Sequence, residues 1–300
     1  QCLAEGDGLC YKKILRNPVI SAANVPFEFQ KGDFRDSKLW REDGKFYMAC
    51  VLKMPDGKGS LVCFRSENLL DWKFVSVIDK SSGKSGMWEC PDIFKLDGKD
   101  VVIFSPQEMK ADFENGLHDG NNSVYMTGFL KRPEFIFERE MRTENSLNFA
   151  QIDGGIDFYA PQTCLAPDGR RIMIAWMQNW ESYITPQNYL WSGMMTFPRE
   201  LEFKNGKLFQ NPVRELLSYR KKCECGVVSG TSSFIKNGFS HGDIELEFFS
   251  AFENSADCKN QDEKFSLVLS RNVAGKKFSV EFTCDFAEQT LCFDRRNSVE

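Results

Sequence analysis

The stretch ECPDIFKLDGKDVVIF, residues 89–104, contains the pattern that decides the fold. An extended run leads into the pair Asp97-Gly98, and a second apolar run at 101–104 follows it. A pair of this kind between two such runs is typical of a tight β-hairpin, because both central residues of a type I′ turn need a positive φ. The stretch therefore predicts two antiparallel strands joined by a short turn.

Two other stretches repeat this pattern. One runs from Arg35 through Asp43-Gly44, and the other runs from Tyr159 through Asp168-Gly169; the same turn is expected at Asp56-Gly57 and Asn205-Gly206. The repeating unit is about 50 residues long, which is the size of a four-stranded propeller blade. Long helical periodicity is absent apart from one short helix expected over 213–220, so the sequence predicts an all-β fold.

The propeller hypothesis has a consequence for the first strand of each copy. In a propeller the first strands of successive blades line one central channel, so equivalent positions converge. Six residues are expected to meet there: Arg35, Asp36, Glu89, Cys90, Tyr159 and Ala160. Two carboxylates in one funnel match the needs of glycoside hydrolysis, one as proton donor and one that stays ionised. The alternative, that Asp36 and Glu89 only cap strand ends, stays open.

The composition excludes several classes of partner. The chain has 300 residues, of which 42% are hydrophobic and 27% charged, as in a globular protein with a sizeable core. Its net charge of −5 argues against nucleic acid or an anionic membrane as a partner. The sequence contains no run of about 18 apolar residues, which is the length that a membrane-spanning helix needs. The oligomeric state stays open.

The cysteines indicate the redox compartment. Eleven are scattered without a C-x-x-C pair, the closest being Cys223 and Cys225, and there are only two histidines. We therefore expect no metal site. Cysteines inside apolar runs are typical of small buried hydrophobes in a reducing compartment. This favours a cytoplasmic protein, although the chain opens on Gln1 and secretion stays open.

Five motifs occur in a fixed order along the chain: FRDSK at 34–38, WECPD at 88–92, FYAPQT at 158–163, IAWM at 174–177 and FPREL at 197–201. Together they resemble glycoside hydrolase family 32, the β-fructofuranosidases that include invertase, sucrose-6-phosphate hydrolase, levanase and inulinase. LCFDR at 291–295 is similar to a strand of the C-terminal β-sandwich of that family.

The resemblance implies the domain organisation. It implies a five-bladed β-propeller over 1–212, a linker over 213–222 and a β-sandwich over 223–300. Aligned with the family in order, the chain is expected to lack the first blade and most of the second, and the sandwich is expected to be truncated at its C-terminal end.

The resemblance also implies roles for particular residues. Glu89 matches the general acid/base of a retaining glycosidase, and Asp36 matches the carboxylate that holds fructose hydroxyls and stabilises the transition state. Arg35, Cys90 and Trp176 match substrate-binding positions, with Trp180 as a competitor for Trp176. The implied substrate is a small saccharide, namely sucrose, sucrose 6-phosphate or a fructan, and no cofactor is needed.

The residues themselves add two expectations about this site. Tyr159 precedes the third copied strand and is expected to reach the funnel, with core packing as the alternative. Trp88 and Pro91 flank the acid and are expected to desolvate Glu89, which would favour its protonated form.

Two departures from the family pattern matter. The family motif Arg-Asp-Pro has Ser37 in place of proline, which frees φ at that position. The family nucleophile is an aspartate in an Asn-Asp-Pro stretch, and that tripeptide does not occur in these 300 residues. We therefore expect this chain to be an inactive fragment of a fructosidase. The alternative is a non-catalytic fructoside-binding or scaffold propeller.

Overall fold

The computed structural model describes residues 1–81, 85–112, 115–140, 149–181, 190–220, 264–285, 288 and 290–298. Contacts between residues divide the chain into two compact units, Gln1–Glu224 and Cys225–Glu300, which are described separately. Cys223, Cys225 and the other residues at 221–263 lie outside the described residues, so the predicted borders at 212 and 222 stay predictions.

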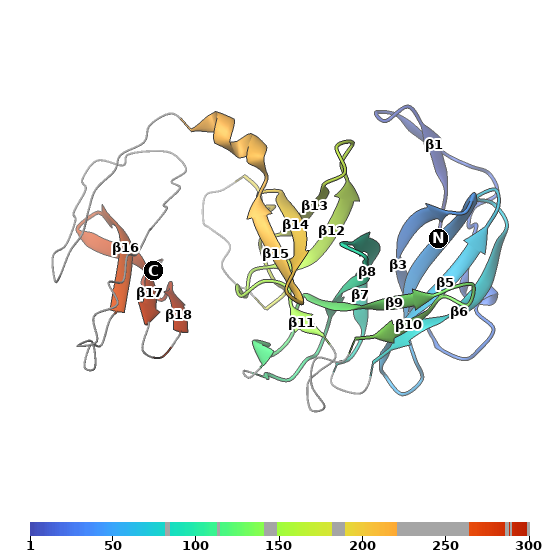
Figure 1. Ribbon diagram of the computed structural model, residues 1–300, viewed down its shortest axis with the longest axis horizontal. Helices are drawn as coiled ribbons and strands as arrows, with labels where there is room; N and C mark the ends of the chain where they lie inside the picture. The colour runs from blue at the N-terminus through green and yellow to red at the C-terminus, as the bar shows by residue number, and fades with distance from the viewer. Residues whose placement is uncertain are drawn as a thin grey trace. The chain divides into compact units, whose positions relative to one another are not determined.

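Three antiparallel sheets form most of the first unit, and in each the strands pair in chain order (Figure 1). The first contains β3 (Gln30–Glu42), β4 (Lys45–Lys53), β5 (Gly59–Ser66) and β6 (Trp72–Lys80). The second contains β7 (Trp88–Leu96), β8 (Lys99–Pro106), β9 (Val124–Lys131) and β10 (Ile136–Arg139), with β11 (Ala150–Gln151) also paired to β9. The third contains β12 (Tyr159–Leu165), β13 (Arg171–Trp176), β14 (Arg199–Lys204) and β15 (Lys207–Pro212). Four-stranded meanders of this kind are the repeating element of a propeller.

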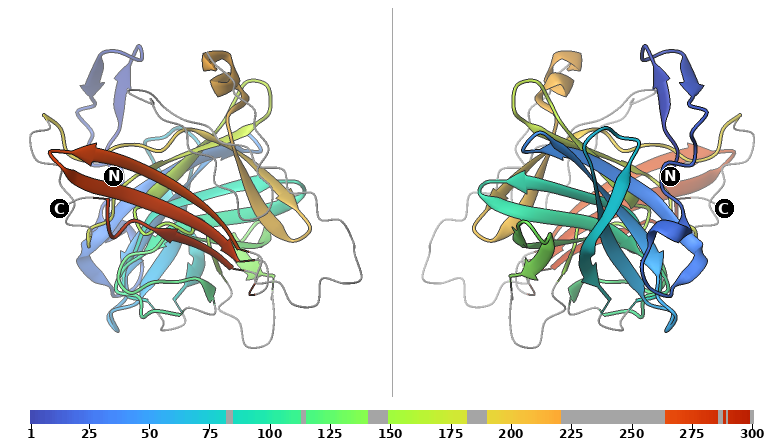
Figure 2. Two further views of the ribbon diagram at one scale, coloured as in Figure 1. Left: turned by 90° about the vertical axis from the view of Figure 1, so that its left-hand side faces the viewer. Right: turned by 90° about the vertical axis from the view of Figure 1, so that its right-hand side faces the viewer.

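The remaining elements are short. A hairpin of β1 (Ala4–Gly6) and β2 (Tyr11–Lys13) extends away from the first sheet (Figure 2), and the 3-10 helix η1 (Ala22–Asn24) follows it. The 3-10 helix η3 (Arg214–Tyr219) lies within the segment where the sequence predicts a short helix.

The second unit has one antiparallel sheet in its described part. Its strands are β16 (Lys264–Val273), β17 (Lys276–Asp285) and β18 (Thr290–Asp294). No helix in the described part of the chain is long and apolar enough to cross a membrane. The near absence of helix confirms the all-β prediction, while the number of five blades stays a prediction.

The hairpin turns follow the sequence in three of the five expected places. Both turn residues have a positive φ at Asp43-Gly44, Asp97-Gly98 and Asn205-Gly206, as a type I′ turn requires. At Asp56-Gly57 and Asp168-Gly169 only the glycine does, so the prediction of type I′ was wrong there. These loops have three residues, one more than a type I′ hairpin loop. They combine a type I turn with a glycine in the left-handed region, after which the strands pair again.

The first strand of each sheet contains the same β-bulge. Residues 36 and 37 of β3 lie opposite the single residue 50 of β4, and 90–91 and 160–161 are accommodated in the same way in β7 and β12. The bulged residues Asp36, Cys90 and Ala160 have φ of 54°, 50° and 54°. Asp36 precedes Ser37 whereas the other two precede proline, so the missing proline does not change the backbone here. The three sheets are therefore structural copies.

The hydrophobic core lies between these sheets. One cluster joins the first and second sheets through residues such as Val51, Trp88 and Phe104. A second cluster joins the second and third sheets through Phe94, Ile103 and Met173. Because each sheet buries side chains toward its neighbour, the first strands β3, β7 and β12 are held close together, and their bulges meet.

Candidate active site

Glu89 lies at the centre of the contacts between the first strands. Its Oε1 accepts a hydrogen bond from Arg35 Nε at 3.1 Å and lies 3.0 Å from Arg35 Nη2. Its Oε2 accepts from the Tyr159 hydroxyl at 2.7 Å and from Gln107 Nε2 at 2.9 Å. The carboxyl group is thus oriented by side chains from β3 and β12 and by Gln107, which follows β8, and 16% of its side chain remains exposed to solvent.

The environment of Glu89 differs from the sequence expectation. Successive side chains of a strand point to opposite faces, so Trp88 points away from Glu89 and into the core. It packs against Phe104 with ring centroids 4.1 Å apart, and its Nε1 donates to Ser85 Oγ at 3.0 Å. The neighbours of the Glu89 carboxyl are three polar donors, and the tryptophan does not desolvate it.

Asp36 is attached to the neighbouring sheet through its carboxylate. Its Oδ2 accepts the Cys90 backbone N–H at 2.9 Å and lies 3.7 Å from the Cys90 Sγ. The positive φ at Cys90 turns this N–H out of the β7 ladder, which makes the donor available to another strand. The two bulges therefore fix the position of Asp36 relative to Glu89, which is the residue before Cys90.

Arg35 connects two carboxylates at this site. Its Nη1 donates to Asp33 Oδ1 at 2.6 Å, while its other nitrogens face Glu89. Burial of the guanidinium opposes its charge, but the bonds to Asp33 and Glu89 outweigh this and raise the pKa of Arg35. Arg35 therefore supplies a permanent positive charge next to Asp36.

Tyr159 is almost completely buried, with 2% of its surface exposed, and its hydroxyl reaches Glu89. Burial and then the bond to the Glu89 carboxyl raise the pKa of the Tyr159 phenol well above its usual value. The hydroxyl therefore keeps its proton and donates it to the hydrogen bond. Tyr159 combines the two roles that the sequence left open, because it packs in the core and reaches the site.

Cys90 is held as a neutral thiol. Burial, followed by the negative charges of Asp36 and Glu89, raises the pKa of the Cys90 thiol to about 12. Its contact with Asp36 therefore uses the protonated sulfur as a donor.

We expect Cys90 to resist alkylation at neutral pH. Exposed thiols titrate near pH 8.5, so a group with a pKa of about 12 has roughly a thousandfold less of the reactive thiolate at pH 7.5. Iodoacetamide labelling followed by peptide mass spectrometry should modify the exposed Cys164 at least about 100-fold faster than Cys90, with labelling of Cys90 accelerating as the pH rises toward 12. Equal labelling rates would contradict the raised pKa.

A buried ion pair joins the first strands just below the site. Lys38 Nζ lies 3.1 Å from Asp92 Oδ1, and it also donates to the Thr163 backbone carbonyl at 2.8 Å. The Asp92 side chain is completely buried, and its Oδ2 accepts the Thr163 N–H at 2.6 Å. Gln162 Nε2 completes this network by donating to the Cys90 carbonyl at 3.0 Å. The network connects β3, β7 and β12, which share no ladder hydrogen bonds.

Replacing Lys38 with Met is expected to lower the free energy of unfolding by about 2 to 3 kcal/mol, because it leaves the Asp92 charge buried and unpaired. The loss is set below the range for a fully buried pair because Lys38 retains some contact with water. Urea unfolding followed by tryptophan fluorescence measures it. The double variant Lys38→Met/Asp92→Asn should recover part of the loss, and a change of Lys38→Met below about 0.5 kcal/mol would refute the structural role.

Trp176 ends β13 and lies directly opposite Tyr159 in the β12–β13 ladder. Its ring packs edge-on against Trp180 with centroids 5.3 Å apart. Gly193 is needed beside it, because a Cβ at that position would lie 2.6 Å from Trp176 Nε1. Both tryptophans are thus near the site, and the competition between them for a sugar contact stays open.

The sequence missed several residues that contact the predicted ones. Gln107, Lys38, Asp92 and Gln162 were not among the candidates. Lys38, Asp92 and Gln162 each stand two positions after a bulged residue, so superposing the three sequence copies would have identified them. Gln107 follows β8, outside the copied stretch, and has no such signal.

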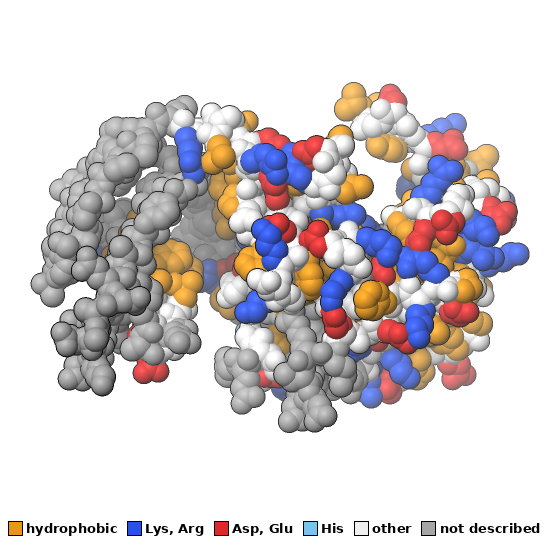
Figure 3. Space-filling view, in the orientation of Figure 1, with side chains coloured by type: hydrophobic (Ala, Val, Ile, Leu, Met, Phe, Trp, Pro, Cys, Tyr) orange, Lys and Arg blue, Asp and Glu red, His pale blue; other side chains and the backbone are white. Residues whose placement is uncertain are grey.

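Basic and acidic groups both lie at the site, namely Arg35 with Asp33, Asp36 and Glu89. On the face seen in Figure 3, basic and acidic side chains are interspersed. In the part of the chain that the structure describes, no group of three or more His, Cys, Asp or Glu side chains could hold a metal ion. The structure brings Glu89 and Asp36 to this site, with Arg35 and Tyr159 beside them.

Repeated four-stranded meanders whose first strands bring two carboxylates together define a β-propeller protein with a glycosidase-type acidic site. The chain belongs to glycosyl hydrolase family 32: the model "Glycosyl hydrolases family 32 N-terminal domain" matches residues 1–212.

Named relatives agree with this family. The chain is 37% identical over 199 residues to raffinose invertase of Escherichia coli, an alignment that covers 64% of this chain and 39% of the relative. It is 38% identical over 232 residues to sucrose-6-phosphate hydrolase of Bacillus subtilis, covering 74% of this chain and 45% of the relative. The chain thus spans less than half the length of these relatives.

Solved structures support the same fold. The GH32 β-fructofuranosidase of Bombyx mori superposes with a TM-score of 0.66 at 31% identity, covering 74% of this chain and 45% of that one. The β-fructofuranosidase of Schwanniomyces occidentalis covers 97% of this chain and 56% of its own, with a TM-score of 0.67 at 20% identity. The latter likeness concerns the fold alone. The predicted family and the propeller-plus-sandwich class are confirmed.

Proposed function

We propose that this chain is part of a retaining glycosidase that releases terminal β-D-fructofuranosyl residues from sucrose or related fructosides. One observation carries the proposal. The bulges of β3 and β7 hold Asp36 and Glu89 side by side, through the Cys90 N–H bond to Asp36 and the Arg35 contact to Glu89. The names of the relatives, raffinose invertase and sucrose-6-phosphate hydrolase, support a saccharide substrate.

Glu89 is the acid/base in this proposal. It donates a proton to the glycosidic oxygen as the leaving group departs, and in the second step it takes a proton from the attacking water. Its position supports this role, since its side chain is partly exposed and its two oxygens are oriented by Arg35, Tyr159 and Gln107.

Asp36 and Arg35 hold the fructosyl group. An ionised carboxylate next to the ring stabilises the positive charge that develops at the anomeric centre, and it accepts hydrogen bonds from ring hydroxyls. The neutral Cys90 thiol and the phenol of Tyr159 keep donors next to these carboxylates. Trp176 is the proposed aromatic contact.

The nucleophile is proposed to come from residues outside these 300. A retaining mechanism needs a second carboxyl about 5 to 5.5 Å from the acid/base, and the chain contains no Asn-Asp-Pro. The chain also spans less than half of the named relatives.

Assaying sucrose hydrolysis with two proteins tests this proposal. The 300-residue chain alone should release no fructose above background, whereas the product of the gene extended upstream, called the extended protein below, should release it at ordinary glycosidase rates. Full activity of the 300 residues alone would overturn the account of the nucleophile. An inactive extended protein would overturn the enzymatic function.

The second candidate is a non-catalytic fructoside-binding or scaffold propeller. The absence of Asn-Asp-Pro from the 300 residues favours it. The upstream sequence discriminates between the two, because a binding protein would have an altered motif and would bind fructosides without turnover.

A cytoplasmic location is also part of the proposal. The eight cysteines in the described part of the chain are free thiols, and Cys50 and Cys63 are buried in the core. Free buried thiols are typical of a reducing compartment.

A further inference from the structure

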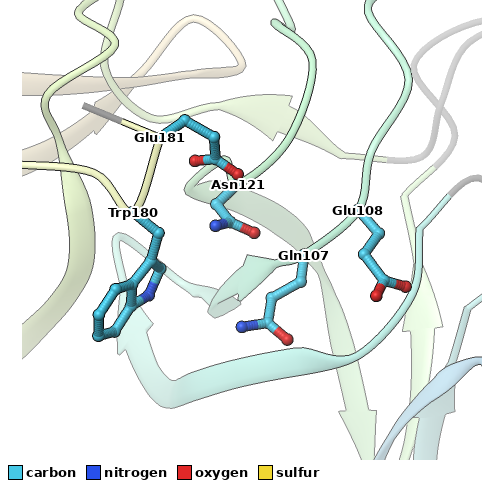
Figure 4. Close-up of a pocket in the computed structure, with 5 residues that line it drawn as sticks. All are labelled: Gln107, Glu108, Asn121, Trp180 and Glu181. Carbon is cyan, nitrogen blue, oxygen red and sulfur yellow. The ribbon is translucent and has the colours of Figure 1, made fainter. Parts of the chain in front are cut away.

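A polar pocket of about 340 Å³ lies just beyond the end of β8, and Figure 4 shows its lining residues. Five residues line it: Gln107, Glu108, Asn121, Trp180 and Glu181. Gln107 belongs both to this lining and to the contacts of Glu89, because its side-chain amide donates to Glu89 Oε2 at 2.9 Å. The pocket and the candidate acid/base are therefore separated by a single side chain.

The pocket lies on the leaving-group side of Glu89. The Oε1 of Glu89 faces Arg35 and hence Asp36, which hold the fructosyl group in the proposed function. The Oε2 accepts instead from Gln107 and from the Tyr159 hydroxyl. Because an acid/base stands between the two halves of a glycoside, the half that departs lies on the Gln107 side.

The side-chain amide of Asn121 is available to bond to a ligand in the pocket. The residue is 93% buried, since only 7% of its surface is exposed, and its side-chain amide makes no hydrogen bond to any described residue. The amide atoms themselves are not fully buried, so they are accessible from the pocket. In Figure 4 the amide lies between Gln107 and Glu181 and faces the pocket. A ligand hydroxyl would satisfy it.

Trp180 and two carboxylates supply the rest of the lining. The Trp180 ring is 64% exposed and is oriented by its edge contact with Trp176, so one apolar ring surface is free to stack on a sugar. Glu108 and Glu181 form no ion pair with any described residue, and the five described lining residues include no lysine or arginine. Gly120 lets Glu181 approach, because a Cβ there would lie 2.5 Å from its Oε1.

We propose that this pocket binds an uncharged sugar leaving group and excludes a phosphorylated one. Hydroxyl groups would bond to Asn121 and to the two carboxylates, which accept hydrogen bonds from hydroxyls. The same carboxylates repel a phosphate dianion, and no cation among the described lining residues offsets them. This inference rests on the proposed function and makes it narrower, because the substrate is then sucrose or another neutral fructoside rather than sucrose 6-phosphate.

Product binding tests the pocket without catalysis. With the 300-residue chain, D-glucose should bind at least about 10-fold more tightly than D-glucose 6-phosphate at low salt, measured by ligand-observed NMR and tryptophan fluorescence. Glu108→Gln/Glu181→Gln should reduce this preference to about threefold or less, because it removes both charges. Glu67→Gln/Glu134→Gln is the matched control. It removes two exposed charges, one between β5 and β6 and one between β9 and β10, and should leave the preference for glucose unchanged.

The remaining lining residues have their own expected results. Asn121→Leu should weaken glucose binding about 10-fold at similar side-chain volume, and a melting temperature near that of the parent shows that the variant folds. Equal binding of the two sugars, or no binding of glucose, would overturn the proposal.

Kinetics of the extended protein separate this inference from the function itself. The kcat/KM for sucrose should exceed that for sucrose 6-phosphate at least about 10-fold, and the ratio should fall as salt screens the carboxylates. An equal or higher kcat/KM for sucrose 6-phosphate would refute the pocket assignment and leave the fructosidase function standing. If neither substrate is hydrolysed, the proposed function fails, and the sugar-binding experiment still decides the pocket.

Discussion

Replacing Glu89 with Gln in the extended protein is expected to lower kcat for sucrose by about 10²- to 10⁴-fold, the contribution of a positioned general acid/base. The amide cannot donate a proton as an acid. It keeps the shape of the carboxyl group, and its single oxygen can still accept from Arg35, while its NH2 group replaces the oxygen that accepts from the Tyr159 hydroxyl. Sucrose binding should therefore change by less than about threefold. Steady-state and single-turnover measurements separate the two effects.

The leaving group makes this test specific to the acid role. A 4-nitrophenyl fructoside departs with little need for a proton, so its fructosylation step should be slowed least by Glu89→Gln. Glu67→Gln, an exposed change elsewhere on the first unit, should retain parent activity. An equal loss for both substrates would show that Glu89 does not protonate the leaving group.

Replacing Asp36 with Asn is expected to lower kcat/KM by about 100- to 1,000-fold, or about 2.7 to 4 kcal/mol, for every fructoside regardless of its leaving group. The change removes the negative charge that stabilises the oxocarbenium-like transition state. The structure indicates that this substitution preserves the backbone and the hydrogen bond at the bulge. Asparagine tolerates the φ of 54° at this bulge, and its side-chain oxygen can still accept the Cys90 N–H.

Two measurements keep this result interpretable. The melting temperature of Asp36→Asn should stay within about 2 °C of the parent, whereas Asp36→Ala should lower it further, because alanine loses the bond to Cys90 and is strained at a positive φ. If the loss for Asp36→Asn depends on the leaving group as that of Glu89→Gln does, Asp36 is not the transition-state stabiliser.

Much of the fold follows from local chemistry. Asp43-Gly44, Asp97-Gly98 and Asn205-Gly206 form the turns that their sequences predict, because a positive φ at both residues is a local requirement. At Asp56 and Asp168 the same dipeptide forms a different turn, because an extra loop residue allows one. Loop length, which depends on where the pairing ends, decided between them.

The site was partly predictable. The copied stretches place Arg35, Asp36, Glu89, Cys90 and Tyr159 at equivalent strand positions, and the structure brings these residues together. The side to which each neighbour points was harder to predict. Trp88 belongs to the core although it precedes Glu89, because adjacent strand residues point to opposite faces.

The sequence by itself determined the all-β class, the repeated hairpin and the residue types at the start of each copied strand, because turns and strand periodicity depend on neighbours in the chain. Only the tertiary structure decided the partners. Arg35 and Glu89 are 54 positions apart and Lys38 and Thr163 are 125 apart, and both pairs form between sheets that share no backbone ladder. Asn121 and Trp180 face one pocket for the same reason: contacts between packed sheets depend on how their side chains fit, and no local pattern encodes that fit.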